Sequence, residues 1–249
     1  MKILVCIGNV PDTTTKVRFS GDMTKFDVTG VQWVINPWDE LALTRAIELK
    51  EQAGSKIEKV TVINVGKIDA EATIRKALAI GADDAIRVDV DPTDSITVAA
   101  NIAAAVKDQN FDIILAGIES SDYNASAVGA MVAEFLNIPS ISSVSTFDID
   151  NDEIILKREI EGGKETISIP TPFLAIVQKG ICINPRIPAM RGIMMARTKP
   201  LTVVPATDVQ PLVEMGVFEL PPAKAACKMV EADDTDKLVD LLHNEAKAI

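Results

Sequence analysis

Short apolar runs alternate with amphipathic segments of helical period through the first half of this 249-residue chain. The runs have the length of strands, and the segments between them place apolar residues along one helical face. Two parallel strands need a long crossover, usually a helix, so this alternation favours a parallel sheet covered by helices. We therefore predict an α/β fold with a doubly wound, mostly parallel sheet. The predicted strands are 3–7, 59–65, 84–88 and 111–116, and the predicted helices are 36–53, 69–80, 94–107 and 125–136.

The pattern changes to β after residue 140, where apolar and polar residues alternate with period 2. The Gly162-Gly163 pair between two such segments predicts an antiparallel hairpin that extends the sheet. The connection after the first strand is also not helical and predicts two short strands. These β segments are 143–149, 153–161, 165–169 and 173–178, together with 17–19 and 31–34.

Prolines are dense after residue 180, and the segment as a whole is of mixed polarity. Such a stretch buries little apolar surface by itself, so we predict an extended arm. A helix at 236–248, capped by Thr235 or Asp234, ends the chain. We divide the chain into an α/β domain at 1–200 and a C-terminal arm with its helix at 201–249, which leans on a partner chain or packs back on its own domain.

The charge balance excludes several classes of partner. Lys and Arg number 25 against 36 Asp and Glu, for a formal net charge of −11. Affinity for nucleic acid comes from clustered basic side chains, so we predict no nucleic-acid partner. No run of about 18 apolar residues occurs, and the first apolar run is too short for a signal peptide, so we predict a cytoplasmic protein without membrane insertion.

The chain lacks the residues that most catalytic mechanisms use. It has a single histidine, His243, in a segment typical of a surface helix, and three widely spaced cysteines, Cys6, Cys182 and Cys227. These predict neither a disulfide framework, nor a metal site, nor a nucleophile paired with a histidine base. We expect no catalytic residue and no metal.

A mostly parallel sheet binds ligands at the carboxyl ends of its strands, where the strand order reverses. The loops to consider are 7–9, 36–37, 65–66 and 116–128. The first strand is followed by no GxGxxG motif, and the chain has no phosphate-binding P-loop motif, so a nucleotide must be held differently. In the fourth loop, backbone N–H groups and the hydroxyls of Ser120, Ser121 and Ser126 offer a phosphate site at a helix N-terminus. Simple helix capping is the alternative interpretation of these side chains.

The sequence resembles the beta, or small, subunit of electron-transfer flavoprotein along essentially its whole length. The similarity is carried by an ordered set of segments rather than by one motif. They are MKILVCIGNVPDTTTKVR, NPWDELALTRAIELKE, VINVGKIDAEATIRKALAIGADDAIRV, LAGIESSDYNASAVGAMVAEFLNIPSI, REIEGG and INPRIPAMRGIMMARTKP.

The resemblance implies a Rossmann-like sheet of the adenine-nucleotide-binding type in a heterodimer with a larger alpha subunit. It implies that the alpha subunit holds the redox-active FAD and that this chain binds AMP structurally. Electrons would arrive from dehydrogenases of the acyl-CoA dehydrogenase type and leave to a quinone oxidoreductase or another acceptor. The chain would be an electron-carrier subunit without bond-making catalysis of its own, which agrees with the missing histidines.

Carried over motif by motif, the resemblance places the nucleotide against three strand ends and one loop. The loop differs from the family's commonest versions, which have an Asn-Gln-Thr or Ala-Gln-Val run where Ser126-Ala127-Val128 stand. A bifurcating subset that holds a second FAD has a valine at the position of Val128, but its Gly-Asp-Thr run is absent here. The implied contact residues are Cys6, Ile7, Gly8, Asn36, Asp39, Val65, Gly66, Ser120, Ser121, Asp122, Ser126, Ala127 and Val128.

Two further regions carry family roles. Trp38 matches the aromatic residue that approaches the alpha-bound flavin, and Thr13 stands where a tyrosine is common there. The loop 184–195 matches the partner-recognition loop, with Met190 as its apolar anchor beside Pro188, Ala189 and Arg191. Its flexible thioether suits a surface that must accept several partners. For Met194 and Met195, packing in the core is the alternative.

A different class of function stays open from the residues alone. The α/β core would also suit a stand-alone adenine-nucleotide-binding regulatory module. The region after residue 180 discriminates between the two, because such a module has no need of the loop, the arm or the terminal helix.

Overall fold

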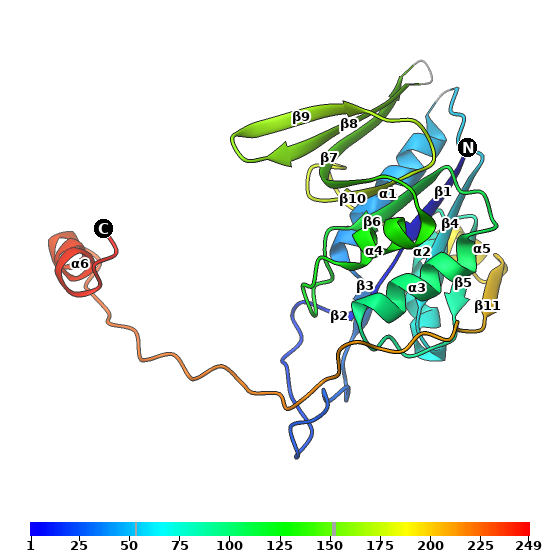
Figure 1. Cartoon of the computed structure of the whole chain (residues 1–249). Coiled ribbons are helices and arrows are strands. Elements are labelled where there is room, and N and C mark those ends of the chain that lie inside the picture. Colours follow the sequence, from blue (N-terminus) through cyan, green and yellow to red (C-terminus); the bar gives the residue numbers. More distant parts are fainter. Residues whose placement is uncertain (53, 151–152) are drawn as a thin grey trace.

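The structure is a computed structural model that describes residues 1–52, 54–150 and 153–249. It is built on one nine-stranded sheet with the order β11-β5-β4-β1-β6-β10-β7-β8-β9 (Figure 1). The strands from β11 to β7 are parallel, and β8 and β9 add an antiparallel hairpin at one edge. The strands are β1 (Lys2–Cys6), β4 (Lys59–Val65), β5 (Asp84–Val88), β6 (Ile113–Gly117), β7 (Ser140–Asp150), β8 (Glu153–Ile160), β9 (Gly163–Ser168), β10 (Phe173–Val177) and β11 (Leu201–Val204).

Helices cover both faces of this sheet. The α-helices of the body are α1 (Pro37–Glu51), α2 (Glu71–Ile80), which follows the 3-10 turn η1 (Ile68–Ala70), α3 (Ser95–Val106), α4 (Val128–Leu136) and α5 (Met190–Ala196). Buried side chains of α1 and α2, with Ala196 of α5, form one core with the sheet, whereas α3 and α4 form the other. The predicted α/β doubly wound fold is confirmed.

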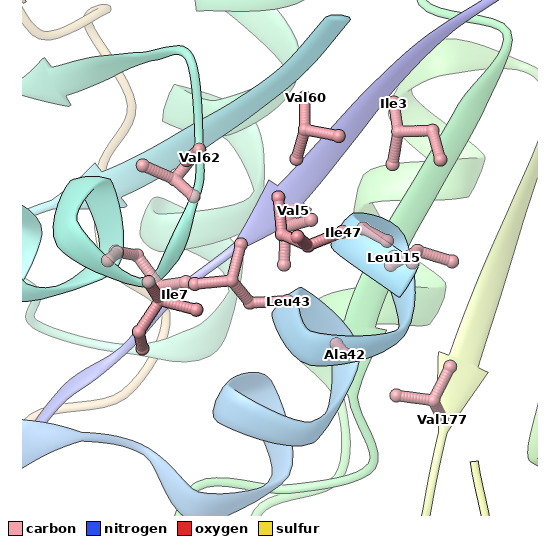
Figure 2. Close-up of a cluster of buried hydrophobic side chains, with 14 of the residues drawn as sticks. Ile3, Val5, Ile7, Ala42, Leu43, Ile47, Val60, Val62, Leu115 and Val177 are labelled. Atoms are coloured by element: carbon pink, nitrogen blue, oxygen red, sulfur yellow. The ribbon is translucent and has the colours of Figure 1, made fainter. Parts of the chain in front are cut away.

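Alternation along the central strand explains the two cores. Ile3, Val5 and Ile7 point to the face of α1, where they meet Leu43 and Ile47 (Figure 2). Leu4 and Cys6 point to the opposite core. Strands buried on both faces are continuous apolar runs, which is why β4 and β5 have the predicted bounds.

The helix starts follow local rules only in part. Asp94 caps α3 in a capping box with Thr97, close to the predicted start. Helix α4 begins at Val128, three residues later than predicted, and α1 ends at Glu51. The predicted end of α1 at residue 53 lies outside the described residues.

The structure differs from the predictions at three places. Residues 17–19 form no strand, and only an isolated bridge joins Phe19 to Phe26. Instead a two-stranded antiparallel sheet pairs β2 (Asn9–Pro11) with β3 (Trp33–Ile35). The terminal segment is a shorter helix, α6 (Thr235–Asp240), capped by the Asp234 side chain and followed by the π turn η2 (Leu241–Glu245). The sequence analysis also missed β11, which pairs with β5 at the sheet edge.

The arm first crosses the body and then leaves it (Figure 1). The amide of Thr207 donates to Asn101 Oδ1, and the amides of Leu212 and Val213 donate to Asp94 Oδ2. Phe218 then stacks on Phe19, with ring centroids 4.7 Å apart. Beyond this point the chain extends away from the body to α6. The division into 1–200 and 201–249 stays a prediction.

Candidate functional site

The strand order reverses at β1, which lies between β4 and β6. From β1 the sheet is built outward through β4 and β5 on one side and through β6, β10 and β7 on the other. In an open parallel sheet, such a switch point opens a crevice at the carboxyl ends of the strands. The residues just after β1, β4 and β6 therefore form the candidate site.

Asp39 joins the two strand ends at this switch point. Its Oδ2 accepts the amide N–H of Gly8 after β1, and its Oδ1 accepts that of Gly117 at the end of β6, both at 2.8 Å. Asp39 as a whole residue is 7% exposed. Burial raises the pKa of Asp39 from 3.8 to about 6, although both amide hydrogen bonds favour the charged form. The amides that would receive an anion here are thus already bonded to a carboxylate of the protein.

The first turn of α1 lies so close to the end of β6 that position 117 must be glycine. A Cβ there would lie 2.4 Å from Asp39 Oδ1 and 2.6 Å from the Cβ of Trp38. At Gly8 an added Cβ would meet its nearest atoms at 3.4 Å, which is ordinary contact. Gly117 thus lets the first turn of α1, with the half-buried Trp38, sit against the end of β6.

Asn36 connects the same turn to the loop after β6. It occupies the N-cap position before Pro37 but makes no side-chain cap bond. Its Nδ2 donates to Glu119 O at 2.8 Å, and its Oδ1 accepts the amide of Ser121 at 3.1 Å. The Asn36 side chain therefore positions the loop after β6 and does not cap α1.

The loop leads into α4, whose N-terminus has no side-chain cap. Gly129 packs closely against β10, because a Cβ there would lie 2.9 Å from Ile176. Asn124 and Ser126 have positive φ angles of 50° and 51°. Asp122 to Ser126 are exposed, and Ala127 and Val128 are half-buried.

The three loop serines have different partners. Ser120 Oγ donates to the carboxylate of Asp122, and Ser126 Oγ donates to Glu119 Oε2 at 3.3 Å. Ser121 Oγ is buried without a hydrogen-bond partner. The uncapped helix amides and this hydroxyl fit an anionic or hydroxyl-bearing ligand group. Residues 117–128 contain no Lys or Arg.

The end of β4 brings a residue that the sequence analysis missed. Asn64 is buried, and its Nδ2 donates to Ile7 O at 2.8 Å, which ties β4 to the end of β1. Its Oδ1 is buried without a partner, and a Cβ on Gly66 would come within 2.8 Å of it. The signal for Asn64 was a polar residue inside the apolar run KVTVINV. Val65 and Cys6 are buried beside it, and burial raises the pKa of the Cys6 thiol.

The predicted partner-recognition residues lie elsewhere. We call residues 183–196, which end with α5, the recognition segment. Gly192 packs on Ala79 near the C-terminal end of α2. Since α2 starts after β4 and ends before β5, this contact lies at the amino ends of the strands, opposite the switch point.

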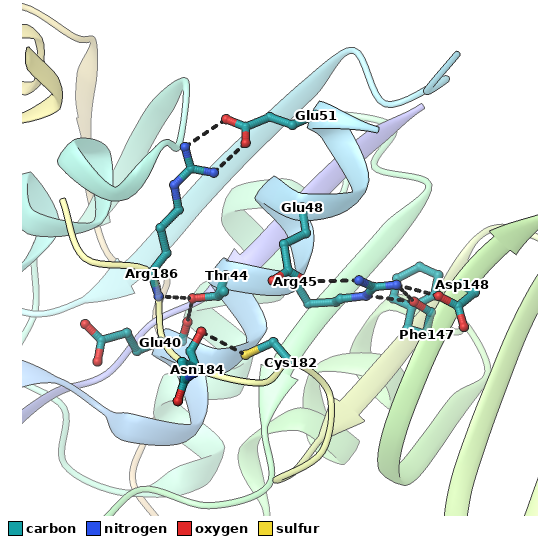
Figure 3. Close-up of polar contacts among 10 residues, drawn as sticks. All are labelled: Glu40, Thr44, Arg45, Glu48, Glu51, Phe147, Asp148, Cys182, Asn184 and Arg186. Atoms are coloured by element: carbon teal, nitrogen blue, oxygen red, sulfur yellow. Dashed lines mark hydrogen bonds and ion pairs between the residues drawn. The ribbon is translucent and has the colours of Figure 1, made fainter. Parts of the chain in front are cut away.

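The recognition segment is tied to α1 at its start (Figure 3). The Arg186 amide donates to Thr44 Oγ1 at 2.9 Å, and its guanidinium binds both carboxylate oxygens of Glu51 at 2.6 and 2.9 Å. Pro188 is half-buried, whereas Ala189, Met190 and Arg191 are exposed. Met194 and Met195 are exposed, so the core-packing alternative for them is wrong. Thr13 is also exposed, in the loop after β2.

Within 1–52, 54–150 and 153–249, no helix is long and apolar enough to cross a membrane. The same residues contain no group of three or more His, Cys, Asp or Glu side chains arranged to hold a metal ion.

The fold and the switch-point site define a doubly wound α/β protein with a candidate ligand site at the carboxyl edge of its sheet. The electron transfer flavoprotein domain model matches residues 24–209, more than half of the chain. The chain belongs to this family, as a member of the beta-subunit type.

Relatives of known name match this chain over its full length or nearly so. The chain is 34% identical to the electron transfer flavoprotein subunit beta of Bacillus subtilis, with 100% of each chain covered. It is also 34% identical to the subunit beta of Syntrophomonas wolfei, with 99% of this chain and 98% of the relative covered. A third relative, the acryloyl-CoA reductase electron transfer subunit gamma of Anaerotignum propionicum, is 30% identical with 97% of each chain covered. These names support a role in electron transfer.

Proposed function

We propose that this chain is the beta subunit of a heterodimeric electron-transfer flavoprotein that relays electrons from dehydrogenases of the acyl-CoA dehydrogenase type. The electrons pass through an FAD held mainly by the alpha subunit to a quinone oxidoreductase or another acceptor. The observation that carries the proposal is the full-length similarity to beta subunits, which extends through the recognition segment and the arm. Its three cysteines are free, which fits the cytoplasm as the proposed compartment.

We infer further that the switch-point site binds AMP as a structural ligand. Asp39 bonds to the amides of Gly8 and Gly117, so the uncapped N-terminus of α4 is the better place for a phosphate. The buried hydroxyl of Ser121 supports this placement, because it has no partner within the protein. The ligand would then contact the loop 120–128 and the ends of β1 and β4.

The exposed apolar residues outside this site support a subunit rather than a stand-alone module. Met190 of the recognition segment and Leu238 and Val239 of α6 all present apolar side chains to solvent. Exposed apolar surface of this extent is typical of interaction sites. We propose that the arm and α6 pack on the alpha subunit and that Trp38 and Thr13 face its flavin.

Electron relay is tested with the complex of this chain and its alpha partner. An acyl-CoA dehydrogenase and its acyl-CoA substrate are added, and flavin absorbance of the complex is followed. We expect reduction to proceed only when dehydrogenase, acyl-CoA and complex are all present. A chain that retains nucleotide but binds no flavin-containing larger chain would contradict the proposal and favour the regulatory module.

A further inference from the structure

Helix α5 has seven residues, which is too short to be stable alone in water. Its Ala196 is buried in the core, while Met190 and Met194, one turn apart, are 75% and 68% exposed. Ile187, just before the helix, is 86% exposed. We call Ile187, Met190 and Met194 the methionine face. Something other than helix propensity must hold this face outward.

Two cations hold α5 to α2 in a reciprocal arrangement. Arg75 of α2 donates through Nη1 to Ala196 O and Lys199 O at the end of α5, both at 2.8 Å. Lys199, which follows α5, donates through Nζ to Leu78 O and Ala82 O at the end of α2, at 2.9 and 2.6 Å. Arg75 of α2 thus bonds to carbonyls at the C-terminal end of α5, and Lys199 after α5 bonds to carbonyls at the C-terminal end of α2.

The two helices also pack closely against each other at Gly192. A Cβ on Gly192 would lie 2.4 Å from Ala79 O, so the backbones of α5 and α2 touch. Lys199 also stands one residue before Pro200, whose carbonyl accepts the amide of Ala85 beside β11. The arrangement therefore fixes α5 relative to both α2 and the edge of the sheet.

We propose that Arg75 and Lys199 are positioning residues that pre-organise the methionine face for the electron-donating dehydrogenase. The inference rests on the proposed function and adds to it two residues that lie outside the switch-point site. Interfaces for interprotein electron transfer are small and weak. Ordering a binding surface on association costs free energy, so a surface that is already ordered binds more tightly. A loosened α5 would cost affinity for the donor and leave the electron acceptance of the flavin unchanged.

The test uses the complete complex with the variants Arg75→Met, Lys199→Met and Gly192→Ala. The control is Arg158→Met, which removes a half-buried cation paired with Glu165 in the distant hairpin. We expect KM for the complex, as substrate of the dehydrogenase, to rise at least fivefold in the three variants, with kcat within twofold of wild type. FAD content and reduction by dithionite should match wild type, and Lys199→Arg should restore KM to within twofold.

A second readout follows α5 itself. Trypsin cleavage after Arg191 and Arg197 should be at least fivefold faster in the three variants than in wild type or in the control. Wild-type KM and cleavage rates in all three variants would overturn the inference, as would a KM increase of the same size in Arg158→Met. A wild-type complex that dithionite reduces but the dehydrogenase does not would contradict the proposed function instead, while the cleavage rates would still decide whether the two cations hold α5.

Discussion

Asp39 is a buried carboxyl whose two oxygens each accept one backbone amide across the switch point. Its folded-state pKa of about 6 exceeds the ordinary 3.8, so between these values the folded chain binds more protons than the unfolded chain. Its contribution to stability therefore falls as the pH rises through this window and levels off above it. The free energy of unfolding of wild type minus that of Asp39→Asn should fall by up to about 3 kcal/mol from pH 4 to pH 7.

Urea denaturation at four or five pH values measures this difference directly. All other titrating groups are shared by the two proteins, so the pH dependence of the difference isolates Asp39. A difference that stays constant from pH 4 to pH 7 would show that the carboxyl keeps its ordinary pKa and is not desolvated as the structure requires.

Gly117 and Gly8 offer a matched pair at the same site. Gly117→Ala places a methyl group 2.4 Å from Asp39 Oδ1, so the first turn of α1 must move. We expect a loss of about 1–3 kcal/mol in stability and a changed tryptophan emission of the chain, because overpacking forces side chains and backbone to shift. Gly8→Ala, whose methyl group fits at 3.4 Å, should cost less than about 1 kcal/mol. Equal effects of the two substitutions on melting would contradict the close approach at Gly117.

At the scale of elements, Asp94 joins α3 to the arm. Its Oδ1 accepts the amide of Thr97, and its Oδ2 accepts the amides of Leu212 and Val213. Asp94→Ala should lower stability by about 0.5–2 kcal/mol and speed chymotrypsin cleavage at Phe218, because both the cap and the arm lose a partner.

Thr97→Val is the matched control for this substitution. It removes the reciprocal half of the capping box but leaves the carboxylate of Asp94 bound to the arm. We expect lower stability with an unchanged cleavage rate at Phe218. Faster cleavage in Thr97→Val as well would mean that the arm responds to the helix as a whole and not to Asp94.

The elements could be predicted where one local pattern decides them. Runs such as KVTVINV and DAIRV predict β4 and β5 with their observed bounds, because both faces of these strands are buried. The edge strand β11 could not be predicted, because LTVV is short, half exposed and flanked by prolines. The strand expected at 17–19 is reduced to the isolated bridge between Phe19 and Phe26.

The loops that form the candidate site could be predicted from the sequence, but the hydrogen bonds that join them could not. The rule for parallel sheets predicted the strand ends, and the resemblance supplied Asn36 and Asp39. Their partners, the amides of Gly8, Gly117 and Ser121, depend on β1 lying beside β6, which only the assembled sheet specifies. The hydrogen bonds of Arg75 and Lys199 between α2 and the end of α5 also could not be predicted, because they join residues that lie 117 to 124 positions apart in the chain.

For the whole molecule, the arm divides into a bound part and a free part. Among the residues that the structure describes, Phe218 donates the last backbone hydrogen bond from the arm to the body. A chain ending at Phe218 should therefore melt within about 3 °C of the full chain, because little buried surface is lost. The same truncation should weaken association with the alpha subunit at least tenfold in a pull-down titration. Association of unchanged strength would contradict the role proposed for residues 219–249.

The most direct test of the account is the ligand content of the complex with the alpha subunit. The purified complex is denatured, and released FAD and AMP are quantified by chromatography and absorbance, in wild type and in Gly117→Ala. The control is Gly163→Ala, at an open position in the hairpin. The account predicts one FAD and one AMP per heterodimer, with AMP reduced in Gly117→Ala and retained in Gly163→Ala. Two FAD without AMP would contradict it, because this subunit would then hold a second flavin and electron bifurcation would be the function to test.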